Sequence, residues 1–451
     1  MKNNNVRTFV LSQILIVLLI AKAVLVLQGE KVETTPSTTE AVVSAESHQC
    51  VFCHTMKTPS VVDQWRDSSH ARSGVSCAEC HAAEEGEPDA QEHYGSLISA
   101  LVTPKDCGAC HETETAQFLD SHHAKGGEVL GSLDNYLGEV VEGFGANISG
   151  CQQCHGSIVE VDEKGKLTAD TWPNSGIGRV NPDGTAGACS ACHSRHDFSV
   201  SQARTPETCG KCHLGPDHPQ KEVYEESKHG IAYRSHMNEM NMDKSQWVVG
   251  VDYSAGPVCA TCHVSATPNQ ARTHDIGGRL SWNIRAPVSK KTKNADQKRK
   301  AMQEVCMNCH NEGYVKNHYK QLDEGIGLYN EKFAKPAGEM VKALKEAGLL
   351  DSTPFNEEVD WTYFYLWHHE GRRARNGLAM MAPDYVQWHG FYDIAERFYM
   401  ELIPQAEHLM PGIADEILER PEHKWFRGNL SDEERKGINE SYQKRYRQKG
   451  M

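Results

Sequence analysis

Apolar and polar positions divide the chain into four stretches. The only long apolar run, Phe9–Leu27, follows the basic residues Lys2 and Arg7 and is typical of a signal peptide or an N-terminal membrane anchor. Its length favours an uncleaved anchor. We therefore interpret residues 1–28 as one or the other, and the Thr-, Ser- and Glu-rich residues 29–48 as a flexible linker. Either form of the first segment exports the chain to the periplasm or an equivalent compartment.

A helical pattern begins at Lys320. Apolar residues there recur three or four positions apart, and we expect this first helix to end near Pro336. A second helix is predicted to start at Thr353-Pro354 and to end at Gly371 or Gly377, and a third starts at Pro383. Residues 320–451 are therefore predicted to form an α-helical domain.

The cysteines change this picture, because all 16 fall into eight Cys-x-x-Cys-His motifs. In such a motif the two thiols attach a haem covalently, and the histidine ligates its iron. Zinc knuckles, thioredoxin-like pairs and disulfide frameworks do not require the histidine, so we exclude them. The motifs, which predict eight haem c groups, are Cys50, Cys53 and His54; Cys77, Cys80 and His81; Cys107, Cys110 and His111; Cys151, Cys154 and His155; Cys189, Cys192 and His193; Cys209, Cys212 and His213; Cys259, Cys262 and His263; and Cys306, Cys309 and His310.

These motifs define an octahaem-binding domain over residues 49–319. Their short spacing leaves little room for long helices or strands, so we expect stacked haems to organise short segments around themselves. The predicted fold class is mainly α: a haem-stacked N-terminal part followed by the α-helical C-terminal domain. The net charge of −14 argues against a nucleic-acid partner.

Sixteen of the 24 histidines lie outside the motifs, enough to give every iron a second imidazole. Counting therefore cannot reveal an iron with an open side. An internal repeat of an aromatic residue, a serine and a histidine at fixed offsets nominates three distal ligands: His70, His123 and His229. The other candidates are His93, His196 and His274, with His389 or His369 from the helical domain for a seventh.

Several stretches outside the motifs resemble the hydroxylamine oxidoreductase family of octahaem cytochromes, among them CSACHSRHDFS, CGKCHLGPDHPQ, LWHHEGRRARNG and MMAPDYVQWHGFYD. The resemblance covers most of the chain from Cys50 to about Tyr399. It implies that the haem on Cys151 and Cys154 is five-coordinate and catalytic. It also implies that Asp217 and His218 form an acid–base pair on the open side of this haem.

The same resemblance implies a homotrimer in which Tyr385 is bonded covalently to the catalytic haem of a neighbouring subunit. Relatives that lack this tyrosine work in the reductive direction. We therefore expect an enzyme that oxidises hydroxylamine to nitric oxide or nitrite. Seven haems with two histidine ligands would pass electrons to an acceptor cytochrome or a quinone-linked membrane protein. Hydrazine oxidation or nitrite reduction on the same fold, or pure electron transfer, are the alternatives.

Overall fold

The computed structural model describes residues 45–130 and 133–447. The expected signal peptide or anchor lies outside the described residues, as does most of the expected linker. The linker's last residues begin helix α2 (Ala45–Lys57). Within the described ranges, no helix has the length and apolar character needed to cross a membrane.

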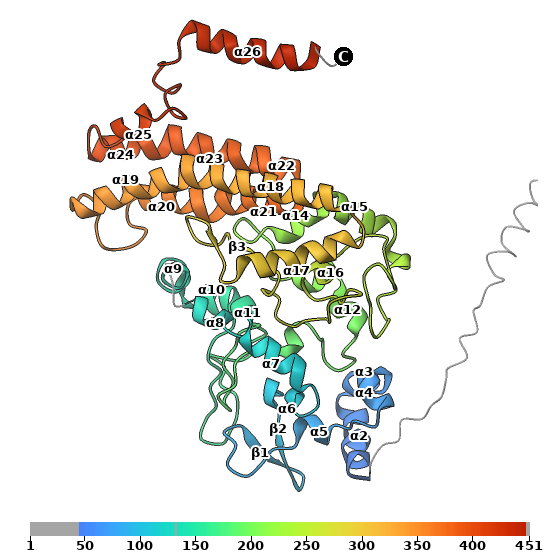
Figure 1. The fold of residues 1–451 in the computed structure, drawn as a ribbon. Helices are drawn as coiled ribbons and strands as arrows, with labels where there is room; N and C mark the ends of the chain where they lie inside the picture. The colour runs from blue at the N-terminus through green and yellow to red at the C-terminus, as the bar shows by residue number, and fades with distance from the viewer. Residues whose placement is uncertain (1–44, 131–132, 448–451) are drawn as a thin grey trace, which may run out of the picture. The chain divides into compact units, whose positions relative to one another are not determined.

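The structure confirms the mainly α fold class (Figure 1). Its strands form two antiparallel hairpins. In the first hairpin β1 (Ala90–His93) pairs with β2 (Ser96–Ser99), with His93 opposite Ser96. In the second, β3 (Trp282–Asn283) pairs with β4 (Lys290–Lys291). The rest of the described chain is helix, turn and loop.

The N-terminal part is built from short helices, as the spacing of the motifs predicts. Several motifs form a single helical turn that ends at or next to the histidine. The elements of this part that follow α2 are α3 (Pro59–Asp67), α4 (Ser69–Arg72), α5 (Ala78–His81), α6 (Pro104–Gly108), α7 (Glu112–Asp120), α8 (Gly126–Val129), α9 (Leu133–Tyr136), η1 (Leu137–Gly143), α10 (Phe144–Ser149), α11 (Cys151–His155), η2 (Cys189–Ala191), α12 (Val200–Arg204), α13 (Pro206–Gly210), α14 (Gln220–Glu226), α15 (Lys228–Ser235), η3 (Met237–Glu239) and α16 (Cys259–His263).

The internal repeat is a helix junction. In each copy the serine ends one helix, because its backbone N–H donates to the aromatic residue's carbonyl at 3.0 Å. The serine hydroxyl then accepts a hydrogen bond from a backbone N–H of the next turn, which is the usual role of a helix N-cap. The aromatic residues and the serines are buried. This junction presents the histidine two positions after the serine, and the three copies are Trp65, Ser68 and His70; Phe118, Ser121 and His123; and Tyr224, Ser227 and His229.

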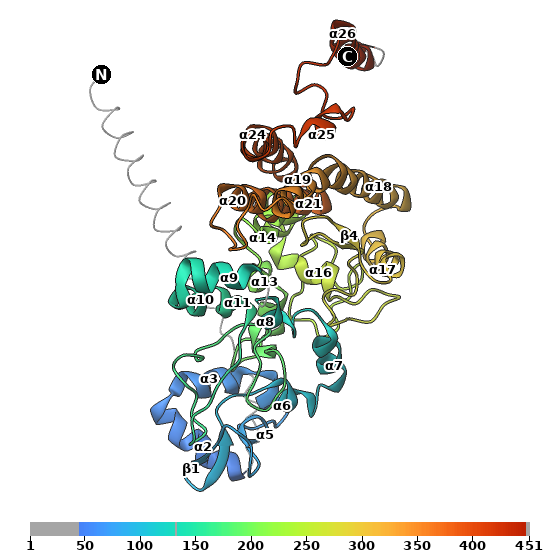
Figure 2. The ribbon, with the colours of Figure 1, turned by 90° about the vertical axis from the view of Figure 1, so that its left-hand side faces the viewer.

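The C-terminal part consists of longer helices, and those from α18 to α24 lie side by side in both views, whereas α26 stands apart (Figures 1 and 2). Its core contains Tyr329, Phe333, Leu344, Phe398 and Leu402, all nearly inaccessible to solvent. The elements are α17 (Ala295–Met307), α18 (Glu312–Tyr329), η4 (Asn330–Ala334), α19 (Lys335–Glu346), α20 (Glu358–Phe364), η5 (Tyr365–Glu370), α21 (Gly371–Met380), α22 (Pro383–Val386), η6 (Gln387–Tyr392), α23 (Asp393–Glu396), η7 (Arg397–Leu402), α24 (Ile403–Leu409), α25 (Asp415–Glu419) and α26 (Asp432–Arg447).

Two predicted helix ends are wrong. The first helix begins at Glu312, earlier than expected, and continues past Pro336 to Glu346. The π-helical turn η4 ends two residues before this proline, which is the second residue of α19, and such a turn can accommodate a residue that lacks a backbone N–H. The second helix passes Gly371 and Gly377 and ends at Met381, which has a left-handed backbone conformation.

Candidate functional site

One continuous cavity of about 3450 Å³ runs through the N-terminal part and is lined by residues from all eight Cys-x-x-Cys-His motifs. Its walls combine apolar side chains with the cysteines and histidines that attach haem c. The buried aromatic residues of the repeat, Trp65, Phe118 and Tyr224, also line it. The cysteine thiols, the histidine rings and the apolar walls together fit covalently attached porphyrins.

Six motif histidines face a second histidine ring at nearly constant distance. Two metal–imidazole bonds of about 2.0–2.1 Å, together with the two half-widths of the rings, place ring centres about 6 Å apart on opposite sides of a metal. The observed centre-to-centre distances match this value. They are 6.1 Å for His54 and His93, 6.4 Å for His81 and His196, 6.2 Å for His111 and His70, 5.9 Å for His155 and His218, 6.0 Å for His213 and His123, and 6.1 Å for His310 and His229.

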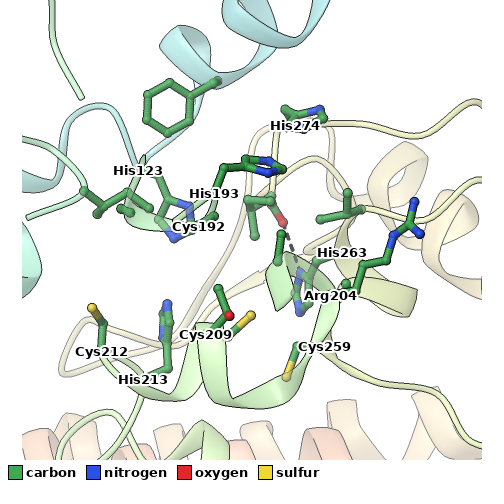
Figure 3. Close-up of a pocket in the computed structure, with 18 of the residues that line it drawn as sticks. His123, Cys192, His193, Arg204, Cys209, Cys212, His213, Cys259, His263 and His274 are labelled. Carbon is green, nitrogen blue, oxygen red and sulfur yellow. Dashed lines mark hydrogen bonds between the residues drawn. The ribbon is translucent and has the colours of Figure 1, made fainter. Parts of the chain in front are cut away.

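Five of these six opposite rings are distal ligands that we predicted from the sequence. Figure 3 shows one pair, His123 and His213, inside the cavity. Hydrogen bonds to Nδ1 orient motif rings: His81 donates to the Ser99 carbonyl at 2.9 Å, and His263 donates to the Ile276 carbonyl at 3.1 Å. Because Nδ1 of each of these rings makes a hydrogen bond, Nε2 is the nitrogen that remains available to ligate iron.

Two motif histidines have no such ring opposite them among the described residues. His193 lies near the predicted ligand His274, which contributes to lowering the pKa of His193 to about 4, after the larger effect of burial. The predicted seventh ligand, His389, does not face His263. That ring instead contacts Tyr385 and lies 3.3 Å from the Asp384 carboxylate. Two histidines that the sequence analysis does not single out also line the cavity, His122 and His318.

Contacts between cysteines of different motifs show which attachment sites are neighbours. Cys107 contacts Cys189, Cys154 contacts Cys212, and Cys209 contacts Cys259. Weaker electrostatic neighbours are Cys77 with Cys50, Cys80 with Cys107, Cys192 with Cys209, and Cys262 with Cys306. The motifs therefore form a connected series from Cys50 to Cys309, and the motif of Cys151 and Cys154 joins it as a branch at Cys212.

The branch motif has the most distinctive surroundings. Across from His155 lies His218, whose Nδ1 contacts the Asp217 carboxylate. Burial opposes ionisation of Asp217, but the hydrogen bond and charge of His218, helped by His368 and Arg372, hold its pKa well below the usual range. Asp217 is therefore a carboxylate at neutral pH, paired with an imidazole that faces the branch motif.

The helical domain supplies the outer wall of this site. Arg372 on α21 lies 3.8 Å from the Asp217 carboxylate and donates to the Arg285 carbonyl. His368 on η5 is buried and stacks on Phe364 with ring centres 4.2 Å apart. Sequence reasoning assigned no role to His368 or Arg372. The sequence feature that could have pointed to them is the stretch LWHHEGRRARNG, because it places several charged and titratable residues on a helix that otherwise packs into the core.

Tyr385 lies on α22, partly exposed, beside His389 with ring centres 5.7 Å apart. Its neighbours Pro383, Val386 and Gln387 line the cavity of their own chain, whereas Tyr385 is not among the lining residues. Within the described residues, the structure therefore does not bring Tyr385 together with Asp217 and His218 inside one chain.

Comparison with family profiles gives two matches. Residues 180–357 match the profile described as "Seven times multi-haem cytochrome CxxCH", and residues 21–82 match "Cytochrome c554 and c-prime". A curated relative is a probable nitrite reductase–hydroxylamine oxidoreductase fusion protein of Kuenenia stuttgartiensis. It is 27% identical over 270 residues, which is 51% of this chain and only 27% of that relative's length.

Two solved structures share the fold. A hypothetical multiheme protein superposes with a TM-score of 0.71 and 25% identity, covering 81% of this chain and 95% of the other. A Kuenenia stuttgartiensis reducing HAO-like protein complex superposes with a TM-score of 0.61 and 21% identity, covering 82% and 87%. The chain thus carries the covalent haem-attachment motifs of multihaem c-type cytochromes and has the fold of these solved multihaem structures.

Proposed function

We propose that this multihaem cytochrome c carries eight haem c groups and oxidises hydroxylamine at the one attached to Cys151 and Cys154. The observation that carries the proposal is the Asp217–His218 pair, because among the six facing histidine pairs in the described chain only His155 faces a ring in contact with a carboxylate. When bound, the haem supplies an iron that can hold a small nitrogen compound and take up its electrons.

The protein's own contribution is to handle protons. Oxidation of hydroxylamine releases protons together with electrons, so a base must stand beside the reacting nitrogen. His218 accepts a proton on Nε2, and the adjacent Asp217 carboxylate stabilises the imidazolium that results. The hydrogen bond from His218, with smaller contributions from His368 and Arg372, lowers the pKa of Asp217 and keeps it ionised, so that the carboxylate does not take the proton itself.

A neighbouring subunit completes the site in this proposal. Tyr385 is partly exposed and does not line the cavity of its own chain, which suits donation to a second copy in a homotrimer. Such a copy would bond the tyrosine to the haem on Cys151 and Cys154, and activity would depend on assembly.

The test is the reduced optical spectrum together with mass spectrometry of haem-bearing peptides. We expect wild-type protein to show one haem absorbing away from ordinary c-type bands, and a peptide that joins Tyr385 to the Cys151–Cys154 peptide through haem. Tyr385→Phe should retain eight haems and lose both features along with most hydroxylamine oxidation. Tyr392→Phe, which removes another partly exposed hydroxyl from the same helical run, is the control. Recovery of the Tyr385 peptide free of haem from wild-type protein would contradict the proposal.

Nitrite reduction is the second candidate. His218 faces His155 at a distance shared with the other pairs, and the solved HAO-like complex that this chain resembles in fold is named as reducing. A protein without the tyrosine bond that reduces nitrite and does not oxidise hydroxylamine would favour this direction. If His218 proves to be an iron ligand and no haem binds an external ligand, electron transfer alone remains.

Electrons would leave at the Cys50 end of the series. Here Phe52, Met56 and Tyr94 are 73%, 66% and 80% exposed, and Tyr94 contacts the ring of His93. Residues 45–103 contain nine acidic and three basic side chains, a net charge of −6. An apolar centre in acidic surroundings suits a basic electron carrier in an extracytoplasmic compartment. Tyr94→Lys, which removes the exposed ring and repels a basic partner, should slow reduction of such a carrier and leave haem content unchanged.

A further inference from the structure

A backbone segment more than 20 residues away holds the end of the branch motif. Ile177 N–H donates to the Cys154 carbonyl at 3.0 Å, and Gly178 N–H donates to the His155 carbonyl at 3.1 Å. Val180 continues this pairing by donating to Ser157 at 3.0 Å. In the other seven motifs, as far as the described residues show, the last cysteine and the histidine do not both accept backbone hydrogen bonds from so distant a segment.

Five glycines allow this approach; we call Gly126, Gly127, Gly156, Gly176 and Gly178 the glycine brace. A Cβ atom on Gly176 would collide with the backbone of Gly156, and one on Gly178 would collide with the backbone of Gly126. A Cβ on Gly126 would lie 2.8 Å from the His155 carbonyl oxygen. The main chains therefore touch where any side chain would separate them.

The glycine brace joins two neighbouring sites. Gly126 N–H donates to the carbonyl of His123 at 3.1 Å, and the ring of His123 faces His213. On its other side the brace holds His155. The two motifs concerned are also those whose cysteines Cys154 and Cys212 are in contact. The same backbone contacts thus link His155 at the Cys151–Cys154 motif to His123, which faces His213 at the neighbouring motif.

A second anchor makes the segment rigid. Arg179 is almost fully buried, and its guanidinium donates to Asn181 at 2.8 Å and to the Val102 carbonyl at 2.9 Å. A buried guanidinium is costly unless its donors are paired. These bonds therefore tie residues 174–181 to the chain just before the Cys107 motif, and the brace cannot shift without breaking them.

We propose that the glycine brace positions His155, and with it the iron of the Cys151–Cys154 haem, against the haem on Cys209 and Cys212. The brace touches no substrate and acts through His155. This proposal rests on the proposed function in one respect: it takes the haem on Cys151 and Cys154 as the place where electrons enter the protein. Electron transfer between two haems falls steeply with their separation, so a small displacement of His155 slows it.

The test uses three variants of the full-length holoprotein. Gly126→Ala places a methyl group against the His155 carbonyl, and Gly176→Ala acts on Gly156 behind it. Gly145→Ala on α10 is the matched control, because nothing lies within 4 Å of its Cβ position. The readouts are haem content by intact mass, the electron paramagnetic resonance spectrum of the ferric protein, and the rate at which hydroxylamine reduces the haems in a single turnover.

We expect both brace variants to retain eight haems, to change the ferric signal of one haem, and to reduce their haems more slowly than Gly145→Ala. Gly145→Ala should match wild type. A Gly126→Ala protein with unaltered spectrum and rate would overturn the proposal. If the wild type does not react with hydroxylamine, the proposed function fails, and the ferric spectrum of Gly126→Ala still tests the brace.

Hydrogen exchange on the wild-type holoprotein provides a check that does not depend on variant folding. The peptide containing residues 174–180 should exchange as slowly as the mostly buried helix α21, since Ile177 and Gly178 are bonded to the branch motif. Exchange as fast as in the exposed helix α26 would overturn the proposal, whatever the variants show.

Discussion

The site at His155 and the site at His213 are neighbours built from the same motif, and their cysteines Cys154 and Cys212 are in contact. Their facing rings are nearly equally spaced, 5.9 Å to His218 and 6.0 Å to His123. The motif and the ring spacing therefore cannot distinguish them. Any difference in chemistry must come from the groups around the second ring.

Those groups differ in kind. His123 is partly buried and has no carboxylate in contact, so burial and then the nearby histidines lower its pKa to about 4. A neutral imidazole in such a position is a good permanent ligand. His218 instead contacts the Asp217 carboxylate, with Arg372 behind it. In the proposed function, the carboxylate behind the second imidazole is what makes His218 a proton acceptor and leaves His123 a ligand.

Removing that carboxylate should have the largest effect. Asp217→Asn keeps the shape and removes the charge that stabilises the His218 imidazolium. We expect kcat for hydroxylamine oxidation to fall about 10²- to 10⁴-fold, the usual contribution of general acid–base catalysis, with the haem spectrum unchanged. Asp120→Asn, an exposed carboxylate on α7, is the control. A kcat equal to that of the control would show that His218 works without Asp217.

The second prediction concerns the site at His213, where removal of the facing histidine should leave one side of the iron open. His123→Gly removes the ring that faces His213, which should create a new high-spin iron and a second cyanide-binding haem without loss of haem. The same substitution at His70 or His229 should behave alike, because the repeat builds all three positions. The measurement is the ferric spectrum with and without cyanide. A spectrum that stays low-spin in all three variants would show that these rings are not iron ligands.

The helical domain, which forms the outer wall of the His155 site, should show its own pH dependence. Burial raises the pKa of the Glu370 carboxyl to about 7, although Arg397 lies 2.5 Å away and opposes this. The folded protein therefore prefers protonated Glu370, and this stabilisation is lost as pH rises from about 4.5 through 7. Wild type should lose up to about 3 kcal/mol across this range, at 1.36 kcal/mol per pKa unit.

Glu370→Gln should remove that part of the pH dependence, and thermal unfolding of the holoprotein at several pH values measures it. Glu401→Gln is the matched control, since Glu401 pairs with the same Arg397 at 2.7 Å but is 42% exposed. Equal slopes of stability against pH in wild type and Glu370→Gln would contradict the account of this carboxyl.

The smallest effect concerns the junction that presents His123. Ser121 caps the turn that carries this histidine and is buried, so Ser121→Ala should destabilise the fold by about 0.5–2 kcal/mol. Cyanide binding at the His155 site should be unchanged. Ser431→Ala removes a similar cap from exposed α26 and should leave every haem signal unaltered. A change in the His155 signal in Ser121→Ala would mean that the two sites are coupled through this turn.

The sequence was most informative where covalent chemistry leaves a local pattern. The motifs and the aromatic–serine–histidine repeat are local, and the rings opposite His111, His213 and His310 are those that the repeat nominates. The helical C-terminal part could be predicted because apolar residues recur there every three or four positions. Ligation by iron stays a prediction for each of these pairs.

Long-range geometry could not be read in the same way. His389 was nominated for a seventh site, but it lies beside Tyr385 and Asp384 because η6 turns it there. The approach of Arg372 to Asp217 depends on packing between α21 and the loop before α14, which no local pattern specifies. The glycine brace was also hidden, because a glycine that touches another main chain looks in sequence like any loop glycine.

The most direct test of the central claim is a cyanide titration of the ferric wild-type holoprotein, followed by electron paramagnetic resonance. The account predicts that one haem per chain binds cyanide and that His123→Gly adds a second. Peptide mapping of a haem-bearing digest should place any modified haem on Cys151 and Cys154. A titration in which no haem binds cyanide would contradict the account, because His218 would then be a sixth ligand and the His155 site would be as closed as the His213 site.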